Sequence, residues 1–199
     1  MNNTPRFSVC LVSALGLAFS LLWSPLASAA EGEAWLWDAL RKGGHVALIR
    51  HAVAPGTGDP SNFSLRDCTT QRNLSEEGRS QAAKIGLRLR TNGVIFTGVY
   101  SSQWCRCLDT AKLIGMGKVN ELPILNSFFQ HGDRESSQNQ ALKKWLAGQN
   151  LEQPLLLVTH QVNVTAISGV YPASGEIVIM RRAKDGKLSV VGALKTDGQ

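Results

Sequence analysis

The sequence predicts an α/β domain of three layers, in which a mainly parallel sheet carries an antiparallel hairpin at its C-terminal edge. Short apolar segments alternate with longer helical segments along most of the chain, which is the pattern of strands joined by crossover helices. Residues 176–194 instead form two strand-like segments around Asp185-Gly186, a typical hairpin turn. With 199 residues, the chain has the length of one domain.

The first thirty residues have the features of a signal peptide. Arg6 is the only charged residue before Glu31, residues 7–23 are almost wholly apolar, and small residues at 27–30 form an A-x-A-like cleavage site. We predict a signal peptide at 1–30, a mature domain at 31–199, and a periplasmic or secreted protein. The alternative is an uncleaved membrane anchor, although the apolar run is short for a membrane span.

The N-terminal half of the mature chain yields two strands and two helices. The segment "HVALIRH" (45–51) is a buried strand, and the polar loop 53–73 that follows is long enough to suggest a functional role. A helix over 74–93 is capped by Ser75 and carries Glu76 and Glu77 at the positive end of its dipole. A strand over 94–100 and a helix over 105–115 follow.

The C-terminal half continues the alternation. We expect a short strand over 120–125, a helix over 136–148 with Leu142, Trp145 and Leu146 facing inward, a buried strand over 154–160, a short helix over 162–169 and the final hairpin over 176–194.

Two histidines follow two of the predicted strands. His51, preceded by Arg50, ends the strand at 45–51, and His160 ends "PLLLVTH". Ligands of open α/β sheets bind beyond the carboxyl ends of the strands. A third strand leads through Ser101 into the helix that carries Arg106, and a helix N-terminus with a nearby guanidinium suits an oxyanion. The pattern therefore predicts an anion site that contains two imidazoles.

The mature chain contains three cysteines, Cys68, Cys105 and Cys107. An oxidising compartment permits a disulfide, and Cys105 and Cys107 are too close in sequence to pair comfortably with each other. We therefore prefer a bridge from Cys68 to either of them. A zinc site is the alternative, but the spacing of these cysteines matches no standard ligand pattern.

Taken together, these segments resemble the histidine phosphatase superfamily, branch 1, which includes the phosphoglycerate mutases. Arg50-His51-Ala52 resembles its Arg-His-Gly motif, with alanine in place of glycine. The segments "RNLSEEGRSQA" (72–82) and "SSQWCRCLDTA" (101–111) are similar to its next two motifs, and "VTHQ" to its second histidine motif, with Gln161 in place of glycine. The resemblance covers residues 44–195 and implies a phosphoglycerate mutase-like fold.

The resemblance implies that His51 is the nucleophile and forms a phosphohistidine. It also implies that four side chains bind the phosphoryl oxygens, namely Arg50, Arg72, Arg106 and His160. No metal or other cofactor is expected. The resemblance also implies that the proton donor follows the short strand after the Arg106 helix, where Glu135 and Asp133 stand, and it favours Glu135 slightly because the family's usual donor is glutamate. Gln161 stands where the acid phosphatase branch has an aspartate.

The expected activity is metal-independent hydrolysis of a small phosphomonoester. Sugar phosphates and lipopolysaccharide core phosphates are both conceivable substrates, and the net charge of +6 suits either. The basic residues are scattered, so we expect no nucleic-acid partner, and we expect no stable membrane insertion after signal cleavage. The alternatives are a non-catalytic protein that binds phosphoryl ligands on the same fold, and a phosphomutase.

Overall fold

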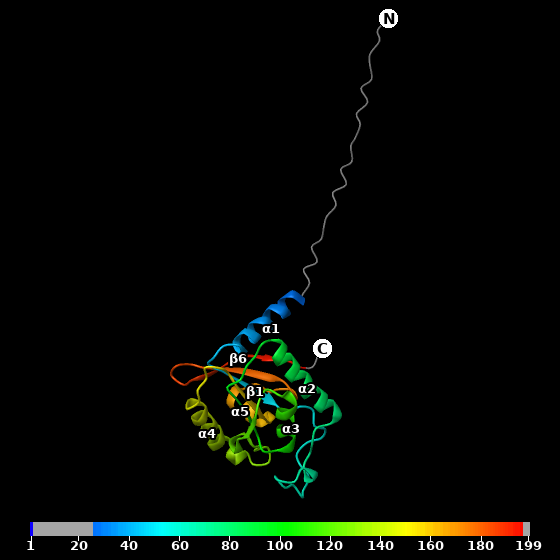
Figure 1. Ribbon diagram of the computed structural model, residues 1–199, viewed down its shortest axis with the longest axis vertical. Helices are drawn as coiled ribbons and strands as arrows, with labels where there is room; N and C mark the ends of the chain where they lie inside the picture. Colours follow the sequence, from blue (N-terminus) through cyan, green and yellow to red (C-terminus); the bar gives the residue numbers. More distant parts are fainter. Residues whose placement is uncertain (2–25, 197–199) are drawn as a thin grey trace.

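The structure is a computed structural model that describes Met1 and residues 26–196. Most of the predicted signal peptide, at 2–25, therefore lies outside the described residues. Figure 1 shows the chain from the first described helix to the C-terminal strand. Within the described part of the chain, no helix combines the length and apolarity that crossing a membrane requires.

A six-stranded mixed sheet forms the centre of the domain, with the strand order β3-β2-β4-β1-β5-β6. The first four strands in this order are parallel, and the last two are antiparallel to their neighbours. This confirms the predicted fold class, including the antiparallel C-terminal edge. The strands are β1 (His45–Arg50), β2 (Gly98–Ser101), β3 (Val119–Glu121), β4 (Leu155–Thr159), β5 (Ile177–Arg182) and β6 (Leu188–Leu194).

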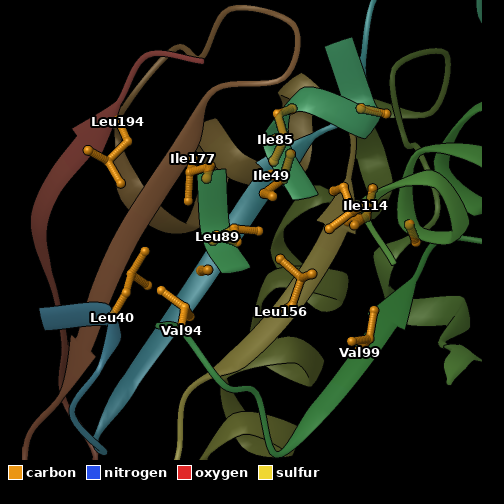
Figure 2. Packing of buried hydrophobic residues seen from close by; sticks show 14 of the residues in the cluster. Leu40, Ile49, Ile85, Leu89, Val94, Val99, Ile114, Leu156, Ile177 and Leu194 are labelled. Atoms are coloured by element: carbon orange, nitrogen blue, oxygen red, sulfur yellow. The ribbon is translucent and has the colours of Figure 1, made fainter. Parts of the chain in front are cut away.

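Helices cover both faces of the sheet and complete three layers. On one face, α1, α2 and α3 pack over a cluster that includes Ile49 and Leu156, as Figure 2 shows. On the other face, α4 and α5 pack over Leu48 and Leu157. Successive residues of a strand point to opposite faces, so the apolar runs 46–49 of β1 and 155–158 of β4 supply both clusters. The helices are α1 (Leu26–Leu40), α2 (Glu76–Thr91), α3 (Cys105–Ile114), α4 (Glu135–Ala147) and α5 (Gln161–Ser168).

Helix α2 lies against the chain that leaves β1. The hydroxyl of Ser75 accepts a hydrogen bond from the Gly78 N–H, as the predicted cap requires. A Cβ at Gly78 would meet the carbonyl oxygen of Val53 at 2.0 Å. Only glycine permits this approach of backbone to backbone. The close contact with Gly78 fixes the position of the segment that follows His51.

The observed elements differ from the predicted ones in three places. Strand β2 begins at Gly98 rather than at residue 94, and Ile95 is exposed. Strand β3 ends at Glu121 because Pro123, which lacks an N–H group, begins a 3₁₀ turn over Pro123–Leu125. Helix α1 was not predicted, and it extends through the predicted cleavage site after Ala29 or Ala30.

Candidate active site

A cavity of about 350 Å³ lies beyond the carboxyl ends of β1 and β4. All five predicted nucleophile and phosphate-binding side chains line it: Arg50, His51, Arg72, Arg106 and His160. They come from two strand ends, a long loop and a helix start, which lie far apart in the sequence. The parallel pairing of β1 with β4 brings the two histidines together, with ring centroids 5.6 Å apart.

The hydrogen bonds of His51 define its tautomer. Nδ1 lies 2.8 Å from the carbonyl oxygen of Ala52, which can only accept, so Nδ1 carries the hydrogen. The Arg106 Nε donates to His51 Nε2 across 3.2 Å, so this nitrogen holds the lone pair. Neutral imidazole with a free Nε2 lone pair is a nucleophile.

Both imidazoles are kept uncharged by their surroundings. Burial, followed by the positive charge of Arg106, lowers the pKa of His51 from 6.5 to about 3. Burial lowers the pKa of His160 well below its usual value, and the neighbouring His51 and Arg106 add to this effect. The two rings are each only 3% exposed. His51 is therefore neutral across the physiological pH range.

Acid is expected to destabilise the folded chain through these histidines. An unfolded histidine binds a proton below about pH 6.5, whereas folded His51 does so only near pH 3. Between these values the unfolded state binds more protons, so stability rises with pH and is lost on acidification. Urea unfolding at pH 4 should give a free energy lower by about 3 kcal/mol from His51 alone than at pH 7. The same comparison in the His51→Gln variant should show a smaller loss, and an equal loss would contradict the assignment.

Arg106 is the central cation of the cavity. Its Nη1 and Nη2 donate to the two carboxylate oxygens of Asp59 at 2.7 and 3.2 Å, and Nη1 also donates to the Arg72 carbonyl. Its Nε points to His51 Nε2. The end of the guanidinium is thus held by Asp59, while the Nε edge is directed at the proposed nucleophile. Because Arg106 is 3% exposed, its orientation is fixed by these contacts.

Arg50 and Arg72 line the cavity in different ways. Arg50 Nη1 donates to the Pro172 carbonyl at 3.0 Å, while its buried Nε has no hydrogen-bond partner among the described residues. A buried donor without a partner is costly, so an anionic ligand would stabilise it. Arg72 instead donates to the carbonyls of Gly58 and Ala54, so it also fixes the loop.

His160 lies where β4 passes into α5. Its Nε2 is 2.8 Å from the Ser102 hydroxyl, which also contacts the Asn126 side chain. Helix α5 begins at the next residue, and its first two residues, Gln161 and Val162, line the cavity. The first N–H groups of a helix lack intrahelical partners and favour anions. The start of α5 therefore offers N–H donors to an oxyanion. The sequence predicted such donors only at the start of the helix that carries Arg106.

The first N–H group of α3, which was predicted to bind an oxyanion, contacts another part of the protein instead. The Cys105 N–H donates to the side-chain oxygen of Gln71 at 2.9 Å. Cys105 also forms a disulfide with Cys68, 37 residues earlier. This confirms the predicted bridge and identifies its partner, while Cys107 is a buried free thiol whose pKa burial raises to about 12. Loop 53–73 is therefore bound to the residue next to Arg106.

Removal of this disulfide should affect both stability and turnover. Closing a loop of this length is worth about 2–4 kcal/mol through restriction of the unfolded chain, so Cys68→Ser should lower the free energy of unfolding by that amount. Because the loop carries Asp59 and Arg72, we also expect kcat to fall about tenfold. Urea unfolding and steady-state kinetics measure the two effects, and Lys112→Ser, at an exposed position of α3, is the control. Unchanged stability and kcat in Cys68→Ser would contradict this role.

The carboxylate that lines the cavity differs from the two predicted proton donors. Asp133 and Glu135 are exposed and do not line the cavity, although His131 and Arg134 from the same segment do. Asp59, in loop 53–73, is the carboxylate among the described lining residues. Burial opposes its ionisation, but hydrogen bonds from Arg106 and Trp104 outweigh burial and lower its pKa. Asp59 is therefore an anion that binds Arg106.

Several other lining residues were also missed. Phe63 and Trp104 contribute aromatic rings, as do Phe129 and Tyr171. Each lies in a loop or next to a helix start, where hydrophobic periodicity carries no information. The only signal in the sequence was the length of the loop 53–73, which indicated a functional segment without identifying its residues.

The described residues contain no group of three or more His, Cys, Asp or Glu side chains arranged to hold a metal ion. The cavity is instead lined by four arginines and three histidines: Arg50, Arg72, Arg106, Arg134, His51, His131 and His160. Such a donor set suits a phosphate or another oxyanion rather than a cation.

The family model of the histidine phosphatase superfamily (branch 1) matches residues 46–129. This range contains His51, Arg72 and Arg106. Among the curated proteins, none is significantly similar to the chain.

Three solved structures illustrate the shared fold. Phosphoserine phosphatase from Entamoeba histolytica, in complex with phosphoserine, is 17% identical, with a TM-score of 0.56 over 77% of this chain and 98% of that one. A mycobacterial glucosyl-3-phosphoglycerate phosphatase in complex with VO3 is 15% identical, with a TM-score of 0.56 over 74% and 97%. The protein histidine phosphatase SixA, complexed with tungstate, is 15% identical, with a TM-score of 0.52 over 76% and 97%.

At these sequence identities, the similarity to the solved structures establishes only the fold. The match to the family model adds a similarity in sequence to the superfamily. The matched segment runs from β1 through the loop after β3 and so contains the strand end, the long loop and the helix start that build the cavity. Over residues 46–129 the chain is therefore similar to the histidine phosphatase superfamily, branch 1, and the domain has the α/β fold of the three solved structures.

Proposed function

We propose that the protein is a metal-independent phosphatase that hydrolyses small phosphomonoesters through a phosphohistidine on His51. The observation that carries this proposal is the pair of contacts that fix His51 as a neutral imidazole, with Nδ1–H on the Ala52 carbonyl and the Nε2 lone pair facing Arg106. A phosphoryl group drawn to Arg106 is thereby placed against the nucleophilic nitrogen. The family match and the small phosphorylated compounds named for its neighbours support this choice.

In the first step, a phosphoryl oxygen replaces His51 Nε2 as the acceptor of the Arg106 Nε–H, and the released Nε2 lone pair attacks phosphorus. A P–N bond forms, the P–O bond to the leaving group breaks, and the leaving oxygen takes a proton from a solvent water molecule. The Nδ1–H of His51 stays on the Ala52 carbonyl, so the positive charge that develops on the ring is stabilised by that oxygen. In the second step, water attacks the phosphohistidine, the P–N bond breaks, and orthophosphate and neutral His51 are released.

The charge of the transferring phosphoryl group is stabilised by fixed cations and dipoles. Arg50 supplies a buried donor without another partner, Arg106 supplies its Nε edge, and His160 lies beside His51. Electrostatic groups that are already oriented need no reorganisation during the reaction, which makes them effective catalysts. We propose Arg72 as a fourth binding group.

A comparison of two kinds of substrate tests which group donates the proton to the leaving oxygen. An aryl phosphate has a good leaving group that needs little protonation, whereas an alkyl phosphate needs an acid. If Glu135 or Asp133 donates the proton, Glu135→Gln or Asp133→Asn should lower kcat for an alkyl phosphate about 100-fold and hardly change kcat for an aryl phosphate.

Because both side chains lie outside the cavity lining, we expect each variant to retain alkyl phosphate turnover within about threefold of the parent. A selective 100-fold loss in either variant would instead identify that residue as the acid and require the 131–135 segment to move inward. Lys143→Gln, on the exposed side of α4, is the control.

We also propose that residues 1–30 are removed on export and that the enzyme acts in the periplasm or outside the cell. The charged start, apolar run and small-residue site of the sequence support this, as does the disulfide, since disulfides persist in oxidising compartments. Intact mass and N-terminal sequencing of the exported fraction test it. A full-length chain recovered with the membrane would contradict it.

The enzymatic proposal is tested with p-nitrophenyl phosphate and a panel of sugar phosphates and lipopolysaccharide core phosphates. We expect release of orthophosphate that continues in EDTA and is inhibited by vanadate. Vanadate binding without turnover of any substrate would indicate a non-catalytic binding protein, and transfer of the phosphoryl group to a second hydroxyl would indicate a phosphomutase. Loss of activity in EDTA that zinc restores would contradict metal independence.

A further inference from the structure

Four aromatic rings line the same cavity as the proposed phosphate site. They are Phe63, Trp104, Phe129 and Tyr171. They come from four separate segments: the loop after β1, the start of α3, the loop before α4 and the loop between α5 and β5. Because no two of them are close in sequence, their gathering around one cavity is a property of the fold.

Two of the rings form a wall fixed beside the catalytic histidines. Phe63 stacks on Trp104 with centroids 5.1 Å apart and planes at 22°. Trp104 in turn meets the ring of His160 edge-on at 5.3 Å, and its indole N–H donates to Asp59 at 3.0 Å. The wall is therefore rigid and lies next to the groups that would hold the phosphoryl group.

The other two rings lie at the mouth of the cavity. Phe129 is 57% exposed and Tyr171 is 72% exposed. Neither makes a ring contact with another aromatic side chain among the described residues. Large rings that line a cavity without an aromatic partner offer faces on which a planar group can stack.

The remaining lining beyond the phosphate site contains no ionised carboxylate apart from Asp59, which Arg106 holds. Arg134, at the mouth, takes part in none of the ion pairs among the described residues. The volume of about 350 Å³ lies near the lower end of the roughly 300–1,000 Å³ found for small-molecule sites. This is room for a phosphoryl group and a ring system rather than for an extended polymer.

We propose that the preferred substrates are phosphomonoesters whose leaving alcohol carries a planar aromatic ring, which stacks on Phe129 or Tyr171 at the mouth of the cavity while the phosphoryl group meets His51. The inference rests on the proposed phosphatase activity and specifies its substrate class. Stacking of a base on an aromatic side chain typically strengthens binding enough to change an affinity about tenfold or more.

The test compares adenosine 5′-monophosphate with ribose 5-phosphate. Both carry phosphate on the same primary oxygen of ribose, so the chemistry at phosphorus is matched and only the ring system differs. We expect kcat/KM to be at least about tenfold higher for the nucleotide. Tyr171→Ala and Phe129→Ala should each remove most of this preference and leave ribose 5-phosphate within about twofold, whereas Tyr171→Phe should retain it.

The controls separate this inference from the proposed function. Ile95→Ala removes an exposed apolar side chain outside the cavity lining and should change neither substrate. Equal kcat/KM for the two substrates, or equal losses for both in the aromatic variants, would overturn the ring preference and leave the phosphatase activity standing. Failure to hydrolyse p-nitrophenyl phosphate as well as both of these esters would overturn the phosphatase proposal itself.

Discussion

The His51→Ala variant is expected to lose about 10⁴-fold or more in kcat with every phosphomonoester that the parent hydrolyses. The loss follows because, among the described lining residues, the Nε2 of His51 is the nitrogen that receives the Arg106 Nε–H, at 3.2 Å. Steady-state kinetics with p-nitrophenyl phosphate measures the effect, and vanadate binding shows that the remaining oxyanion groups are still in place.

The matched control for this variant is His45→Ala. His45 begins the same strand at its opposite end, where its ring contacts the Lys42 and Gly43 carbonyls. It is absent from the cavity lining, so the variant should keep kcat within about twofold. Retention of more than a hundredth of the parental kcat in a folded His51→Ala protein would show that the nucleophile lies elsewhere.

The second large effect concerns the pair formed by Arg106 and Asp59. Arg106→Lys keeps the charge but cannot contact Asp59, His51 and the Arg72 carbonyl at once, so kcat should fall about 10²- to 10³-fold. Asp59→Asn should lower kcat about 10- to 100-fold, because the guanidinium loses the anion that directs its Nε edge toward His51.

If Asp59 acts through Arg106, the double variant should be no slower than Arg106→Lys alone, since the effects of coupled residues are not additive. Additive losses would instead show that Asp59 contacts the reacting groups independently. Breaking a buried ion pair is also destabilising, so circular dichroism and urea unfolding are needed to confirm that each variant is folded. Arg79→Lys, in an exposed pair with Glu76, is the control for lysine substitution.

The parts of the fold with a strong local signal could be predicted from the sequence. The apolar runs of β1 and β4 and the capped, amphipathic α2 are each determined largely by their own residues. Strand β2 is shorter than its apolar segment because pairing with β3 and β4, rather than composition, decides where a strand begins. Helix α1 was missed because its first residues, 26–30, belong to the predicted signal peptide and its hydrophobic periodicity is weak.

In the site too, residues with a local sequence signal could be predicted, and residues placed by tertiary contacts could not. His51 and His160 could be placed because parallel strands end at the same edge of a sheet, and Arg106 because it follows the next strand. Asp59 could not be placed, since its position depends on the path of a polar loop held by the disulfide and by Arg72. The aromatic wall likewise depends on loops whose conformations are set by tertiary contacts.

The fold explains how these groups can be so closely fixed. Ala52 N–H donates to the Thr110 hydroxyl, and Val53 N–H donates to Gln81, so α2 and α3 both hold the chain that leaves β1. His51 N–H donates to the Thr159 carbonyl, which ties the ends of β1 and β4 to each other. The proposed nucleophile, which follows a buried strand and is held on three sides, has little freedom to leave its orientation.

The central claim is that His51 becomes phosphorylated during turnover, and trapping of the intermediate tests it most directly. The enzyme is mixed briefly with a ³²P-labelled phosphomonoester, quenched in alkali and digested, and the labelled peptide is identified by mass spectrometry. We predict a label that is stable in alkali and lost in acid, that resides on the peptide containing His51, and that is absent from His51→Ala. A label on another residue, or parental turnover with no label at any quench time, would contradict the account.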